Sequence, residues 1–193
     1  MIAYKGFTPD LWSRLGDGKK ENCQFEIGET KRVEEAKTVR SGFHCCENPF
    51  ECLTYYDFDG KNRFFRVMAA GDIDEDSMER IACTEITLLK ELSPLEFALA
   101  GMQYIVEHPL RSTWKSGKHR CKVAKDEAEA GGENYIAIAR GKDPRVRGKA
   151  GSILGLLKEG DTEEIIAAKL FVCKPSQAGK WFGVDEGRRV VEK

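Results

Sequence analysis

The chain has 193 residues, and 33% of them are charged, yet the formal net charge at pH 7 is only −1. This length allows one domain, or one core with a small appendage, to bury a hydrophobic core. No apolar run approaches the roughly 18 residues of a membrane-spanning helix, and residues 1–5 lack the features of a signal peptide. The seven cysteines are an odd number, so we expect free thiols in a reducing, cytoplasmic compartment.

Alternating apolar residues predict strands in the first half of the chain, at residues 2–7 and 23–27. Further strands are expected at residues 38–46, 63–70 and 80–89. Together these segments favour a mixed sheet in the N-terminal part.

Two short motifs predict the starts of helices. Asn48-Pro-Phe-Glu51 combines a capping residue, a proline and an acid at the spacing of a helix N-terminus, which predicts a helix over about 49–56. Ser93-Pro-Leu-Glu96 has the same arrangement and begins an apolar pattern of helical period. This second helix should run over about 94–108, because Pro109 ends it.

The C-terminal third reads as a β-meander, with a turn expected at residues 141–151. Its predicted strands are 134–139, 152–157, 164–173, 181–184 and 189–192. We therefore expect an α+β fold: an N-terminal mixed sheet with two helices, followed by the meander. The expected organisation is an α+β core at 1–110, a basic then acidic connecting segment at 111–133, and a β-rich part at 134–193 packed on the same core.

Charge is distributed unevenly along the chain. Residues 1–110 carry about seven more acidic than basic residues, and residues 111–151 carry about six more basic than acidic ones. Such cations release counterions from a phosphate backbone, and an exposed Trp or Arg plane can stack on an unpaired base. The candidate nucleic-acid-binding residues are Arg111, Trp114, Lys115, Lys118, His119, Arg120, Lys122 and Lys125 in a first basic segment, and Arg140, Lys142, Arg145, Arg147 and Lys149 in a second. The alternative is a solvated surface, or one that docks on the chain's own acidic segment.

That acidic segment spans residues 72–79. It lacks the glycine and the regular alternation of a calcium loop, so we expect a solvated loop or one that imitates nucleic-acid phosphates against a basic protein surface. The candidate protein-binding residues are Asp72, Asp74, Glu75, Asp76 and Glu79.

His44 precedes two cysteines in the stretch that leads into the first helix. Zinc bound by His44, Cys23, Cys45, Cys46 and Cys52 is disfavoured because the paired short spacing of zinc ligands is missing. A Cys45 nucleophile served by His44 is disfavoured because neighbouring residues of a strand point in opposite directions. We expect buried thiols, no metal and no cofactor.

Weaker catalytic candidates remain open. His44 and His119 could act as an acid–base pair on RNA, since a histidine can titrate near neutral pH. A core histidine is the alternative for His44.

Several short motifs carry a resemblance. The segments Tyr4-Lys-Gly-Phe7, Ser41-Gly-Phe-His-Cys45, Glu47-Asn-Pro49 and Tyr55-Tyr56 resemble an uncharacterised domain family from bacteriophages and gut bacteria. The Gly-rich segments near 137–151 and the last strands are also similar, whereas 111–133 replaces the Gly/Ala/Ser repeats common in that family. The resemblance implies a phage or mobile-element origin.

A second, more distant likeness is to the ADP-ribosyltransferase fold. Lys5-Gly6 and the strand-then-helix at 41–56 are similar to parts of that fold, and Glu85 would stand for its catalytic glutamate, although Lys5 replaces the usual His or Arg. The leading expectation is a phage accessory protein that binds and inhibits a host nucleoprotein, such as a CRISPR or other antiviral defence effector, in the bacterial cytoplasm. The alternative is an enzyme acting on nucleotide or RNA beside His44.

Overall fold

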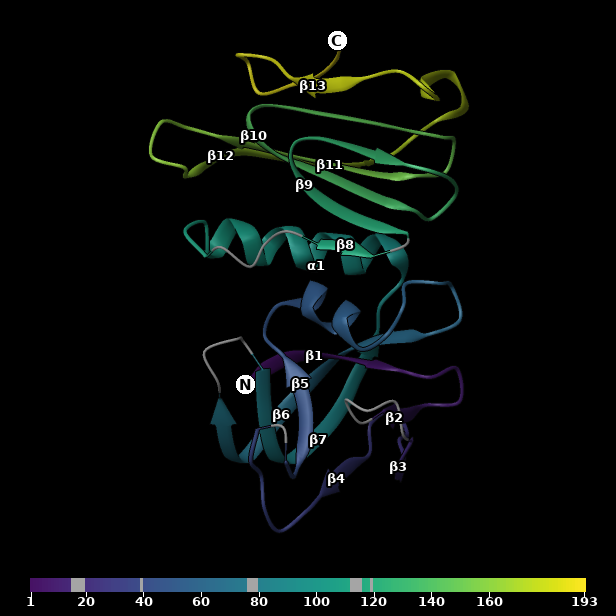
Figure 1. Ribbon diagram of the computed structural model, residues 1–193, viewed down its shortest axis with the longest axis vertical. Coiled ribbons are helices and arrows are strands. Elements are labelled where there is room, and N and C mark those ends of the chain that lie inside the picture. The colour runs from purple at the N-terminus through teal and green to yellow at the C-terminus, as the bar shows by residue number, and fades with distance from the viewer. Residues whose placement is uncertain (15–19, 39, 76–79, 112–115, 119) are drawn as a thin grey trace. The chain divides into compact units, whose positions relative to one another are not determined.

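The computed structural model describes residues 1–14, 20–38, 40–75, 80–111, 116–118 and 120–193. The chain divides into two compact units, Met1–Ser93 and Pro94–Lys193. Both units are built mainly from strands (Figure 1).

Unit 1 is built mainly from antiparallel strands. Its elements are β1 (Ile2–Phe7), β2 (Trp12–Arg14), β3 (Lys20–Gln24), β4 (Thr30–Arg32), β5 (Phe43–Cys46), the 3₁₀ helix η1 (Pro49–Thr54), β6 (Arg63–Glu75) and β7 (Arg80–Glu91). The five-stranded sheet has the order β4-β7-β5-β1-β6, and β6 also pairs with β7. The sheet therefore closes on itself, with β4 added outside the ring. All of its pairings between named strands are antiparallel.

The interior of the closed sheet is filled by alternate residues of each strand, as the period of two requires. Phe7, Phe25 and Phe65 meet there, with ring centroids 5.0 Å apart for Phe7–Phe25 and 5.5 Å apart for Phe7–Phe65. Lys5 shares this inward face of β1 and is 5% exposed. Its Nζ donates a hydrogen bond of 2.7 Å to the carbonyl of His44.

The helix start at Asn48 is confirmed, but the helix is short. The Asn48 side chain accepts a hydrogen bond from the Phe50 N–H at 3.0 Å, and Pro49 occupies the first helical position. The element that follows is a 3₁₀ helix of six residues, which buries Pro49, Phe50, Cys52 and Leu53.

Unit 2 contains α1 (Pro94–Glu107), which confirms the second predicted helix nearly to the residue. The other elements are β8 (Ser116–Lys118), β9 (Cys121–Ala130), β10 (Ile136–Gly148), β11 (Ile153–Glu159), β12 (Ile165–Val172), the 3₁₀ helix η3 (Pro175–Gln177), β13 (Phe182–Val184) and β14 (Val190–Glu192). In the described part of the chain, no helix has both the length and the apolar character needed to cross a bilayer.

The strands of unit 2 form a seven-stranded mixed sheet. β10 runs parallel to both β9 and β11, so that Cys121, Ile136 and Ile153 lie in one row. Because these consecutive strands run parallel, the chain winds as a coil, and the strands of successive turns lie side by side in the sheet. The register of β9 on β10 shifts between Arg140 and Arg145, and the two strands pair again beyond this shift.

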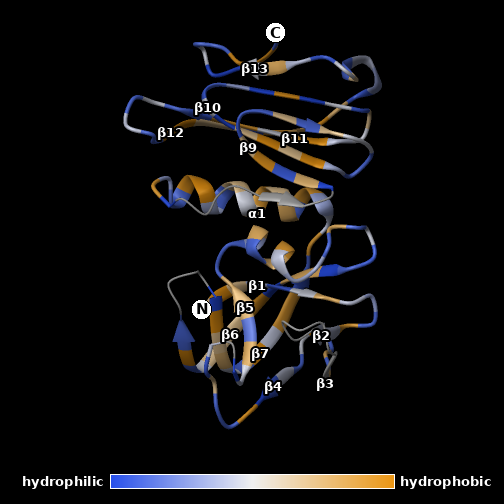
Figure 2. Cartoon of the chain, viewed as in Figure 1, coloured by the Kyte–Doolittle hydropathy of each residue, from blue (hydrophilic) through white to orange (hydrophobic). Residues whose placement is uncertain are grey.

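Apolar residues recur along the central strands of this sheet (Figure 2). Ala137, Ala139 and Leu154 belong to one buried cluster. On the other side, α1 packs against β11, and a Cβ built on Gly155 would lie 2.7 Å from both the Met102 sulfur and a carbon of Ile138. Only glycine lets the helix approach the strand this closely.

The α+β prediction is wrong, because the protein is mostly β. The N-terminal sheet is antiparallel rather than mixed, and the 49–56 helix is a 3₁₀ turn. The C-terminal part is not a meander, since its central strands are parallel. Residues 141–148, expected as a turn, continue β10. Small alanines and charged residues alternate in these segments, and the resulting strands bury the alanines against each other.

Candidate nucleic-acid interface

The first basic segment enters the edge of the unit 2 sheet. β8 pairs antiparallel with β9, with Gly117 opposite Lys122, so the segment forms a hairpin whose second strand lies next to β10. Lys118 belongs to β8. Trp114, Lys115 and His119 lie outside the described residues.

Three basic residues, Arg120, Lys122 and Lys125, lie just before β9 or in its first half. Lys122 and Lys125 are exposed, and within the described residues neither has a carboxylate partner. Arg120 is half-buried, and its guanidinium carbon lies 5.1 Å from the centre of the Tyr135 ring. The ring fixes the plane of the guanidinium without neutralising its charge. Arg111 is held in the same way, over Tyr104, whose hydroxyl it also contacts.

The second half of β9 is acidic, and two of its acids lie in register with arginines of β10. Glu127 is opposite Arg145, and Glu129 is opposite Arg147. These residues form ion pairs of 2.8 Å each. Arg147 also lies over the Trp181 ring at 4.7 Å. The two arginines therefore have partners already, which sets them apart from Lys122 and Lys125.

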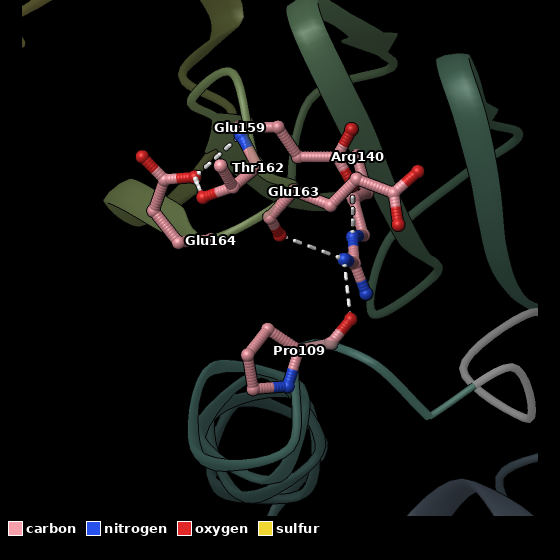
Figure 3. Close-up of polar contacts among 6 residues, drawn as sticks. All are labelled: Pro109, Arg140, Glu159, Thr162, Glu163 and Glu164. Carbon is pink, nitrogen blue, oxygen red and sulfur yellow. Dashed lines mark hydrogen bonds and ion pairs between the residues drawn. The ribbon is translucent and has the colours of Figure 1, made fainter.

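Arg140 has a different environment, because its side chain is only 2% exposed. Its Nε pairs with Glu159 at 2.5 Å, and its Nη2 donates to the carbonyls of Pro109 and Glu163 at 2.6 and 3.2 Å (Figure 3). The guanidinium thereby joins the end of the α1 segment to the turn between β11 and β12. A side chain held this way cannot reach a phosphate, so Arg140 does not belong to the interface proposed below.

Lys142 and Lys149 complete the second basic segment. Lys142 is exposed and pairs with Asp161 at 3.0 Å, and the hydrogen bond to this carboxylate raises the pKa of the lysine. Lys149 is exposed after the end of β10. Of the five basic residues in this segment, four have an acidic partner.

The acidic candidates belong to the end of β6. Asp74 accepts hydrogen bonds from the Thr38 N–H at 2.7 Å and from its hydroxyl at 2.5 Å, so it anchors a loop. Asp72 and Glu75 are exposed. Asp76 and Glu79 lie outside the described residues.

His44 and Glu85 occupy different positions in the closed sheet. His44 is half-buried on β5 opposite Ala82, whereas Glu85 on β7 pairs with Arg32 at 3.2 Å. Catalysis by either residue stays a prediction.

The cysteines near His44 lie on both sides of β5. Cys45 belongs to the core of the closed sheet, together with Cys83, and Cys46 neighbours Cys52 of η1. Hydrogen bonding to these neighbours and burial raise the pKa of Cys45 and of Cys46, which favours neutral thiols. Among the residues that the structure describes, no three His, Cys, Asp or Glu side chains group in a way that could hold a metal ion.

Sequence reasoning identified the cations of this interface but not Tyr135, which fixes Arg120. The alternation of Cys121, Lys122 and Val123 was the available signal for a strand. The surrounding run of basic residues hid this pattern, because such a run is typical of a solvated connecting segment.

Comparison with known proteins gives one match. A domain of unknown function, DUF7666, matches residues 1–100, which include all of unit 1. No curated protein and no solved structure matches the chain. The expected resemblance to an uncharacterised family is thus confirmed, and the chain belongs to the DUF7666 family.

Proposed function

We propose that this protein binds the phosphate backbone of a nucleic acid, within a nucleoprotein, through the hairpin of β8 and β9. The observation that carries the proposal is the contrast along β9: Glu127 and Glu129 are paired by the arginines of β10, whereas Lys122 and Lys125 are exposed without a described acidic partner. Cations in this state gain counterion-release energy from a phosphate chain, and cations in ion pairs gain little.

Arg120 adds a second kind of contact. A guanidinium plane fixed over Tyr135 can stack on an unpaired base or fork to a phosphate. The proposal therefore favours single-stranded segments over uniform duplex, and it predicts little base specificity.

The setting proposed for this binding is inhibition of a host nucleoprotein by a phage or mobile-element protein, with CRISPR and other antiviral effectors as targets. Its support is the resemblance described in the sequence analysis. Asp72 and Glu75, which are exposed at the end of β6, would meet a basic surface of the target protein.

The decisive experiment replaces Lys122 and Lys125 by Gln and measures binding to a fluorescein-labelled single-stranded RNA by anisotropy across a salt series. Loss of two phosphate contacts should weaken binding at every salt concentration and lower the magnitude of the slope of log K against log salt by about 1.4, since each contact to a single strand contributes about 0.7. Lys142→Gln is the control, because it removes one exposed charge that Asp161 already pairs. Unchanged affinity and slope in the double variant would remove the proposal.

A further inference from the structure

β12 forms one edge of the unit 2 sheet. The strand order is β12-β11-β10, with β9 and then β8 continuing on the far side. β12 pairs with β11 along one side, and within the described residues nothing pairs with its other side. Its sequence, Ile165-Ile-Ala-Ala-Lys-Leu-Phe-Val172, has a single charge.

This edge is unusual in length and in its lack of protection. β8 and β14 at other edges have three residues each, whereas β12 has eight. Edge strands are normally kept short, charged, bent or interrupted by proline. β12 has one bulge, where Lys158 pairs with Ala167 and Glu159 with Ile165, and from Ala167 to Val172 the strand is regular.

An unpaired strand edge presents a row of backbone donors and acceptors, which another strand satisfies. We propose that the occupant is β12 of a second copy of this chain, paired antiparallel about a two-fold axis at Leu170. In an antiparallel pair, two directly opposite residues either both direct their N–H and C=O groups toward the partner strand or both direct them away from it. A two-fold axis meets this condition only when one residue lies opposite its own copy, so the axis is placed at a residue and not between two residues.

The side chains of β12 decide which residue lies on the two-fold axis. An axis at Lys169 would set two ammonium groups opposite each other, which is destabilising. An axis at Ala168 would pair Leu170 with Ile166, the residue that the bulge leaves without a partner on β11. An axis at Phe171 would place Lys169 opposite Cys173, which lies beyond the end of β12. An axis at Leu170 keeps the central positions, Ala168 to Val172, within the regular stretch.

With this axis, Leu170 meets its own copy at the centre. Lys169 lies opposite Phe171 of the second copy, and Ala168 lies opposite Val172 of the second copy. Ala168 is exposed, and Val172 is 46% exposed. Pairing a small residue with a branched one covers both, and no like charges face each other. The self-complementarity of this short strand argues for a second copy rather than an unrelated peptide.

The pairing leaves the proposed nucleic-acid contact free. β12 and β8 are the two end strands of the order β12-β11-β10-β9-β8. The dimer would therefore carry one cationic hairpin at each end of a continuous sheet, and a long polyanion could engage both.

The test is the mass in solution, measured by light scattering after size exclusion at the highest soluble concentration. The wild type should be a dimer, and Val172→Asp should be a monomer, because it replaces the apolar contact with Ala168 of the second copy by a carboxylate without a partner, on a residue type that is disfavoured in strands. The double variant Ala168→Lys with Val172→Asp should restore the dimer through two cross-strand ion pairs, since opposed Cβ atoms lie about 5 Å apart. Val190→Asp, an exposed valine on β14, should leave the dimer intact.

Circular dichroism of each variant separates misfolding from dissociation, and the rescue cannot come from folding alone. A monomeric wild type overturns the inference, even if the edge captures a strand of another protein. A dimer that survives Val172→Asp, or one that the double variant fails to restore, overturns it as well.

Discussion

Among the residues whose burial is described, each unit buries one cation in a mostly β structure, and the two units do so by different means. Lys5 of unit 1 has one hydrogen bond to a backbone carbonyl, and its Nζ lies 5.4 and 5.9 Å from the centres of the Phe7 and Phe25 rings. Arg140 of unit 2 has a carboxylate partner and two carbonyl acceptors. A lysine stem can fill an apolar interior with little polar support, whereas the fork of a buried guanidinium requires several acceptors in fixed positions.

The comparison predicts a large cost for removing Arg140. Arg140→Ala leaves Glu159 without its partner and frees the carbonyls of Pro109 and Glu163, so the free energy of unfolding should fall by about 3–5 kcal/mol. Urea unfolding followed by circular dichroism measures this loss. Lys142→Ala removes an exposed pair instead, with side chains 71% and 99% exposed, and should change the free energy of unfolding far less than Arg140→Ala does. Equal costs for the two variants would contradict the role assigned to Arg140.

A second prediction concerns the helix that covers unit 2. Gly155→Ala places a Cβ against Met102 and Ile138, and overpacking of this kind costs about 1–3 kcal/mol. Met102→Ala alone should also destabilise the protein, because it leaves a cavity. The double variant should be more stable than the sum of the two losses predicts. Strict additivity in this double-mutant cycle would mean that the two residues do not meet.

Lys5 should tolerate a change that Arg140 does not. Lys5→Met keeps the volume of the stem and removes the ammonium, so the loss of one hydrogen bond is offset by the loss of a desolvated charge. The free energy of unfolding should change by less than about 1.5 kcal/mol in the urea experiment. Lys5→Ala deletes the stem and should cost more, through a cavity. A loss above about 3 kcal/mol for Lys5→Met would assign the ammonium itself a structural role.

How far the sequence predicts this protein depends on the range of the interactions. The bounds of α1 and the start of η1 follow from caps and prolines a few residues apart, and both were predicted. The first half of β10 was predicted as a strand, but β9 and the second half of β10 were missed, because their pairing depends on residues of neighbouring turns of the coil. Arg145 and Glu127 are far apart along the chain, and only the parallel register brings them together.

The same limit applies to the candidate interface. All the basic residues of 111–149 look equivalent in the sequence, and pairing distances decide which of them keep a free charge. Arg140 had one local signal, since Ile138 and Ala139 before it continue an apolar strand. Lys5 lies between Ala3 and Phe7 in an alternating pattern, which assigns it to the inward face although lysine is usually exposed.

The smallest expected change in the free energy of unfolding concerns an exposed ion pair, which contrasts with the buried Arg140–Glu159 pair. The direction of its pH dependence follows from the pKa of its acid. Arg63 pairs with Glu91 at 2.6 Å in unit 1, with side chains 30% and 42% exposed. The hydrogen bond from Arg63 lowers the pKa of Glu91 below its usual 4.5. Because the folded pKa is the lower one, the pair contributes stability above pH 4.5, and this contribution is lost as the pH falls through the folded pKa.

Glu91→Gln should therefore reduce stability at pH 7 by less than about 1 kcal/mol, and the difference from the wild type should shrink toward acidic pH. Salt should shrink it too, since solvent screens an exposed pair far more than the buried Arg140–Glu159 pair. Urea unfolding at pH 7 and pH 3, each at low and high salt, measures both dependences. A difference that is constant with pH and salt would mean that Glu91 contributes through packing and not through its charge.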